Sequence, residues 1–245
     1  MIPTLGAVFI CKILQSKYFL TRKLFNKVTI AIQPYTHEII NMIKKIQPTH
    51  LVMLFILAGC LIISGIHPFD RTTWILEIFP IFIGLPVLFA TYNSFRLTQL
   101  LYICILIHML ILVLGGAYSY ARVPLGFSIQ EWLHLSRNPY DKIGHFFQGF
   151  APALIAREIL IRKDIIKGKK MLAFIVTCIV LAISASYELI EWASALILGQ
   201  GADEFLGTQG DMWDTQSDMF FALIGAITAQ IVFGGLHNRQ IKNQL

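Results

Sequence analysis

The stretch that decides the fold is "LVMLFILAGCLIISGI", residues 51–66, which contains no charged residue. A helix needs roughly 20 mostly apolar residues to cross the hydrocarbon core of a bilayer, and this run with its flanks has that length. The whole chain has the same character: 56% of its 245 residues are hydrophobic and 14% are charged, against roughly 25% charged in soluble domains. The sequence therefore predicts an all-α membrane protein, because a chain in lipid must satisfy its backbone hydrogen bonds internally.

Five further segments are long enough to cross a bilayer. The weakest of them is 142–161, because it contains His145, Gln148, Arg157 and Glu158. Together these runs predict a polytopic helical bundle of about six transmembrane helices. The predicted spans are 50–66, 75–92, 97–116, 142–161, 171–198 and 217–236.

The distribution of Lys and Arg predicts the orientation of this bundle. Fifteen of the 20 basic residues fall on one side of the six-span arrangement, and four fall on the other: Arg71, Arg122, Arg137 and Lys142. Cytoplasmic loops carry the excess of basic residues in membrane proteins. We therefore expect a multi-pass protein of the bacterial inner membrane with both termini in the cytoplasm. The net charge of +6 is then a topology signal, and we expect no nucleic-acid partner.

The chain divides into three predicted regions. Residues 1–49 form a basic cytoplasmic extension that is partly amphipathic or disordered, 50–236 form the membrane domain, and 237–245 form a short basic cytoplasmic tail. Met42 stands just before the first span, so it is open whether residues 1–41 belong to the native protein.

Acidic residues gather on the side opposite to the basic ones. Eleven of the 14 Asp and Glu residues map to outer loops or to the outer halves of spans. Residues three or four apart lie side by side on a helix, and small residues let membrane helices approach closely. Three predicted helices combine both features on one face. These faces carry Asp141, His145, Gly149 and Pro152; Ser184, Glu188, Glu191 and Ala195; and Asp214, Asp218, Ala222, Gly225 and Ala229.

The three faces predict one outward-facing pocket of carboxylates and an imidazole. Placing an ionisable group at the bilayer centre costs at least ~2.5–3.5 kcal/mol of free energy. Carboxylates that lie so near to one another must share protons or hold a cation. Oxygen ligands suit Mg²⁺, Ca²⁺ or Mn²⁺, and an added imidazole admits Zn²⁺ or Fe. The four cysteines are widely spaced with no CxxC pair, so we expect no cysteine metal site. The predicted ligands of a divalent metal cation are Asp141, His145, Glu188, Glu191, Asp214 and Asp218, with Gln148, Asp211 and His108 around them.

Three long motifs carry a resemblance to a known family. "SRNPYDKIGHFFQGFAPALIAREIL" (136–160), "SYELIEW" (186–192) and "FLGTQGDMWDTQSDM" (205–219) resemble the YjdF-like family of bacterial inner-membrane proteins, from about residue 50 to the end. The resemblance implies a multispan inner-membrane protein and carries no established activity. "DKIGHFF" (141–147) is also distantly similar to a segment of VanZ-like membrane proteins, which ties the chain to the cell envelope by analogy only.

Three functions stay open at this point. A bound cation could act on an envelope or lipid-linked substrate; the carboxylates could couple transport to protons or cations; or the polar cluster could only hold the bundle together in a structural or assembly protein. The sequence contains no recognised nucleophile–base set, so no catalytic residue is predicted. The expected partner is the lipid bilayer, and the small-molecule or lipid substrate and the oligomeric state stay open.

Overall fold

The computed structural model describes residues 46–198 and 209–244, which are helical apart from their connecting turns. The predicted extension over residues 1–49 lies almost entirely outside the described residues. The chain divides into two units, 1–52 and 53–245, and the packing described below is that of the second unit.

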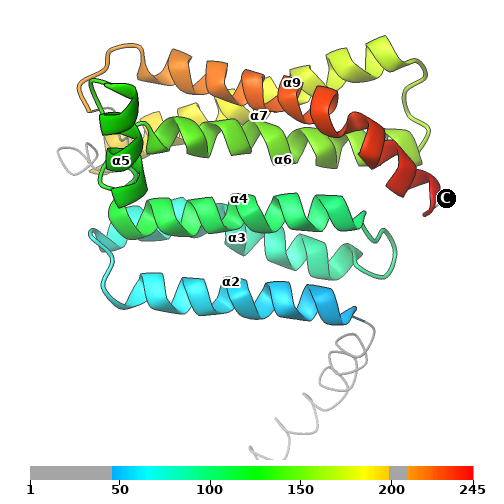
Figure 1. Cartoon of the computed structure of the whole chain (residues 1–245), viewed down its shortest axis with the longest axis horizontal. Coiled ribbons are helices and arrows are strands. Elements are labelled where there is room, and N and C mark those ends of the chain that lie inside the picture. Colours follow the sequence, from blue (N-terminus) through cyan, green and yellow to red (C-terminus); the bar gives the residue numbers. More distant parts are fainter. Residues whose placement is uncertain (1–45, 199–208, 245) are drawn as a thin grey trace, which may run out of the picture. The chain divides into compact units, whose positions relative to one another are not determined.

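Seven helices make up the described part of the chain (Figure 1). Five of them, α2, α3, α4, α7 and α9, are long and apolar enough to cross a membrane. α6 has the length but falls short in composition, because ionisable side chains lie near both of its ends. All six predicted spans correspond to helices whose first residues agree within one helical turn. The helices are α2 (Pro48–Ile66), α3 (Arg71–Thr91), α4 (Gln99–Tyr118), α5 (Pro124–Leu133), α6 (Tyr140–Arg162), α7 (Lys169–Leu198) and α9 (Asp214–Lys242).

The turn between α2 and α3 is held by side chains that cap helix ends. The Asp70 carboxylate accepts a hydrogen bond from the Thr73 backbone N–H at 2.7 Å, which satisfies a donor that the first turn of α3 leaves free. This bond lowers the pKa of the Asp70 carboxyl below its ordinary value. Arg71 donates to the Gly65 carbonyl at 2.6 Å, one of the free acceptors at the end of α2.

α6 lies among α4, α7 and α9, and its most extensive contact is with α9. The two helices run side by side (Figure 1), and two glycines let their backbones touch. A Cβ on Gly149 would overlap the Ala222 carbonyl oxygen, and a Cβ on Gly225 would overlap that of Phe146. The predicted small-residue face of the last span is therefore a packing face, as the full burial of Ala222 confirms.

The helices place two sets of polar residues at opposite ends of the bundle. We call the end with the α3–α4 and α6–α7 turns (92–98 and 163–168) the basic end, and the end where α6 and α9 begin the acidic end (Figure 1). At the acidic end the segments before α6 and α9 are tied together. The Asn138 backbone N–H donates to Gln209 Oε1 at 3.1 Å, and Gln209 Nε2 donates to the Asn138 carbonyl at 3.0 Å. This pair fixes how the first turns of α6 and α9 face each other.

Candidate metal site

Three buried side chains converge at the acidic end. Asp141 and His145 are one turn apart on α6, and Asp218 reaches them from α9. His145 Nε2 lies 3.5 Å from Asp141 Oδ1 and 3.8 Å from Asp218 Oδ2. One ligand atom from each of the three residues lies within 4.8 Å of the others. The spacing is close enough for one ion to touch all three.

The other ring nitrogen of His145 faces two acceptors. Its Nδ1 lies 3.1 Å from Gln148 Oε1 and 3.7 Å from Glu188 Oε1. In the neutral imidazole one nitrogen donates and the other accepts. Gln148 Oε1 can only accept, so a neutral His145 that bonds to it carries the proton on Nδ1 and turns the lone pair of Nε2 toward the two aspartates. This is the arrangement that metal-ligating histidines have, with an outer partner fixing the tautomer.

Two basic side chains neutralise part of the acidic cluster. Lys142 Nζ donates to Asp218 Oδ1 at 2.7 Å and to Asp214 Oδ1 at 2.9 Å. Arg137 pairs with the same Asp214 oxygen and lies 3.2 Å from Asp211 Oδ2. Burial opposes the charge on Arg137, but the hydrogen bond and charge of Asp214 outweigh it and raise the pKa of the guanidinium. Asp214 is thus engaged with two cations, whereas Asp218 keeps its Oδ2 free to face His145.

Two carboxylate oxygens in the cluster lack a hydrogen-bond partner among the described residues. They are Asp141 Oδ2 and Glu188 Oε1, on side chains that belong to residues only 7% exposed. Leaving a buried acceptor unsatisfied costs roughly 1–3 kcal/mol, and more for a charged group. These oxygens therefore call for a proton, a cation or water beside them.

A cavity of 190 Å³ lies against this cluster. Its walls include Asp141 and His145 from α6 and His108 from α4. The Tyr187 hydroxyl donates to Glu77 Oε2 at 3.4 Å, and both residues also face the cavity. The full lining is Glu77, Pro80, His108, Leu112, Tyr120, Asp141, Gly144, His145, Gln148, Pro152, Ile183, Tyr187 and Glu191.

All six residues that the sequence analysis expected as ligands are less than 10% exposed. Asp141, His145 and Asp218 form the compact group, Glu188 lies on the far side of the imidazole, and Glu191 lines the cavity. Gln148 and His108 also lie at the site. Asp211 lies at its rim, where it contacts Arg137. Lys142 was not expected there, although its position three residues before His145 on one helix is a signal that could have found it.

A second polar cluster, at the basic end, is fully satisfied. The Glu158 carboxylate, which is completely buried, accepts from the Thr98 hydroxyl at 2.8 Å, from Arg162 at 2.8 Å and contacts His237 Nε2 at 2.9 Å. The Thr98 backbone N–H also donates to it at 3.0 Å. Because each oxygen has partners, this cluster joins α4, α6 and α9 and leaves no acceptor for a ligand.

Five apolar helices of membrane-spanning length, of which α3, α4, α7 and α9 pack together with α6 around buried polar clusters, define a multi-pass membrane protein. A family model described as "Predicted membrane protein (DUF2238)" matches residues 49–239, and the chain belongs to that family. The chain is similar to "Inner membrane protein YjdF" of Escherichia coli (strain K12), with 59% identity over 182 residues, which cover 74% of this chain and 87% of that protein. The predicted location in the inner membrane is thereby confirmed. No solved structure matches the chain.

Proposed function

We propose that this protein binds one divalent cation through Asp141, His145 and Asp218 and uses it to act on an envelope or lipid-linked substrate. The observation that carries the proposal is the convergence of these three buried ligand atoms within 4.8 Å. In the same proposal the chain has six spans and the basic end faces the cytoplasm, as the positive-inside rule favours. The site then opens toward the cell envelope.

The distances between the ligand atoms support an ion of the size of Zn²⁺. Zinc binds imidazole nitrogen and carboxylate oxygen at about 2.0–2.2 Å, so two ligand atoms at a tetrahedral angle are about 3.4 Å apart. The His145–Asp141 and His145–Asp218 distances are 3.5 and 3.8 Å. An inward movement of a few tenths of an ångström brings both distances from His145 to that value, and the three ligand atoms together lie within 4.8 Å.

The balance of charge also favours a cation. Six carboxylates at the acidic end are buried, and two basic side chains, Arg137 and Lys142, pair with members of this set. Buried like charges raise one another's energy unless a proton or a cation intervenes. With His145 neutral as a ligand, a divalent ion removes half of the remaining difference. The six carboxylates are Glu77, Asp141, Glu188, Glu191, Asp214 and Asp218.

Three protein ligands with an open fourth position are typical of catalytic zinc sites. Two of the three ligands, Asp141 and His145, also line the 190 Å³ cavity, so the open position has room beside it for water or a substrate oxygen. A cation there polarises a bound oxygen and lowers the pKa of a bound water. Glu191 and Glu77 line the same cavity and supply carboxylates that can accept a proton from that water.

Metal analysis of purified protein tests this proposal. We expect one Zn²⁺ or Mn²⁺ per chain after dialysis against the metal ion, loss of that ion in His145→Ala, and its retention in Asp211→Asn. The control residue contacts Arg137 at the rim and accepts a hydrogen bond from the Trp213 backbone N–H, and its side chain is 33% exposed. A protein that binds neither ion, or a His145→Ala variant that binds as well as the parent, would contradict the proposal.

Proton or cation exchange is a second candidate, and the excess of buried carboxylates favours it. Against it, the side chains of α6 between Gln148 and Arg157 offer no ionisable group, a gap of nine residues or ~13 Å at 1.5 Å per residue. Cation-dependent pH changes in proteoliposomes that disappear in Glu191→Gln and persist in Asp211→Asn would favour exchange. Vesicles with no such change leave metal binding as the better account.

A further inference from the structure

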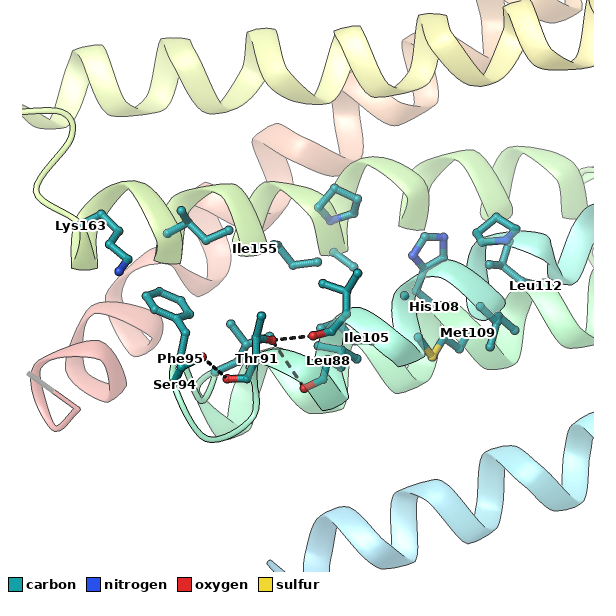
Figure 2. A pocket seen from close by; sticks show the side chains of 18 residues that line it. Leu88, Thr91, Ser94, Phe95, Ile105, His108, Met109, Leu112, Ile155 and Lys163 are labelled. Carbon is teal, nitrogen blue, oxygen red and sulfur yellow. Dashed lines mark hydrogen bonds between the residues drawn. The ribbon is translucent and has the colours of Figure 1, made fainter. Parts of the chain in front are cut away.

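A long apolar groove runs from the polar cavity toward the basic end. It has a volume of 510 Å³ and lies among α3, α4 and α6, within the range of about 300–1,000 Å³ that ligand sites occupy. Figure 2 shows His108 and Leu112 toward one end of it, and Lys163 and Phe95 toward the other. Four residues form the wall that the groove shares with the polar cavity: Pro80, His108, Leu112 and Pro152.

The groove has a closed floor and an open side. Ile81 and Ala151 in its floor are 0% and 1% exposed, whereas Val87 and Ile159 at its rim are 55% and 39% exposed. Val87 and Ile159 are exposed apolar side chains, as side chains that contact lipid are, so the opening is toward lipid. An occupant can therefore enter sideways from the membrane.

The length of the groove matches a lipid chain. Its lining on α4 and the residues before it extends from Leu97 to Leu112, fifteen residues or ~22 Å at 1.5 Å per residue. One leaflet contributes about half of the ~30 Å hydrocarbon core. The groove is thus long enough to hold one acyl chain over its whole length.

The end of the groove near the α6–α7 turn carries a positive charge. Among the described residues that line the groove, Lys163 is the one that carries a charge, and its ammonium lies 5.5 Å from the centre of the Phe95 ring. The neighbouring acid, Asp164, lies 4.0 Å from Lys167 instead. Basic residues at this depth attract anionic lipid headgroups.

We propose that the groove binds one acyl chain of an anionic phospholipid from the leaflet at the basic end, with the lipid phosphate against Lys163. The far end of the chain then lies against His108 and Pro152. It closes the polar cavity toward the basic end, so that water in the cavity has no path along the groove. This assignment does not depend on the metal site.

Native mass spectrometry of delipidated protein titrated with phosphatidylglycerol tests the proposal. We expect one tightly bound lipid in the parent protein and its loss in Gly84→Leu, whose new side chain starts 3.3 Å from the flexible end of Met109 and fills the groove. Gly59→Leu is the matched control, because nothing lies within 4 Å of a Cβ there. Ile155→Trp fills the groove from α6 and replaces Gly84→Leu if that variant does not fold.

The headgroup position has its own test. Lys163→Glu is expected to weaken phosphatidylglycerol binding about tenfold, whereas Lys167→Glu, in the same turn but 88% exposed, leaves it within twofold. Undiminished lipid binding by both groove-filling variants overturns the proposal. So does undiminished binding by Lys163→Glu, because the headgroup then lies elsewhere, as it would for a lipid whose head enters the polar cavity.

Discussion

The close contact between α6 and α9 allows us to predict the effect of adding a single methyl group. In Gly225→Ala the new Cβ stands 2.9 Å from the Phe146 carbonyl carbon and 3.0 Å from the Phe150 nitrogen, where ordinary contacts begin at 3.4 Å. The Cβ would also overlap the Phe146 carbonyl oxygen, and backbone atoms cannot rotate away, so the helices must separate by about an ångström or more. Overpacking of this kind typically costs 1–3 kcal/mol, partly offset by about 1 kcal/mol from the better helix propensity of alanine.

The expected net loss is therefore about 1 kcal/mol in the free energy of unfolding. For a chain of this size that corresponds to a fall of roughly 2–4 °C in Tm, measured by thermal unfolding in detergent. Gly235→Ala is the matched control in the same helix, because nothing lies within 4 Å of a Cβ there, and its Tm should stay the same or rise. The separation should also weaken metal binding, since it moves Asp218 on α9 away from Asp141 and His145 on α6. A Gly225→Ala protein that unfolds at or above the Tm of the parent would refute the close approach of the two helices.

Three further changes have expected outcomes. Lys142→Met leaves Asp214 and Asp218 without the cation that joins them, so thermal unfolding should show a loss of about 3–5 kcal/mol; an unchanged Tm contradicts the pairing. Glu158→Gln removes the buried charge between Arg162 and His237. The same measurement should show a similar loss in the free energy of unfolding, although the length of α6 does not change. Asp70→Ala should cost about 1 kcal/mol through the lost helix cap. Because the folded-state pKa of Asp70 is lowered, its contribution is full above the ordinary value of 3.8 and is lost as the pH falls through the lowered one, so the difference in stability between the two proteins should shrink as the pH falls below 3.8.

The positions of the helices could be predicted because apolar runs in this chain are long and have clear ends. The weakest segment, α6, was still recognisable from its length and from the small residues on its polar face. α9 continues through Lys242, past the end predicted at residue 236, because its last turns are held by contacts that a hydropathy pattern does not contain. His237 is one such contact, since it is fully buried against Glu158.

The faces of the site were predictable, but its pairings were not. Spacing along one helix tells which residues are neighbours, so the burial of Asp214 and Asp218 follows from the small residues that continue their face. Which carboxylate meets a cation depends on how α6 and α9 are rotated about their axes. It also depends on the reach of the flexible Lys142 stem. Spacing alone could not tell that Asp214 pairs with Lys142 and Arg137 while Asp218 turns one oxygen toward His145.

The polar partners of α6 lie far from it along the sequence, and this separation has a consequence during synthesis of the chain. Lys142 and Asp214 are 72 residues apart, and Glu158 and His237 are 79 apart. Because synthesis runs from the N-terminus, α6 leaves the ribosome long before the helix that neutralises it. We therefore expect α6 to pack stably only after α9 has been made, and a chain cut short before residue 214 to be degraded faster than the full-length chain.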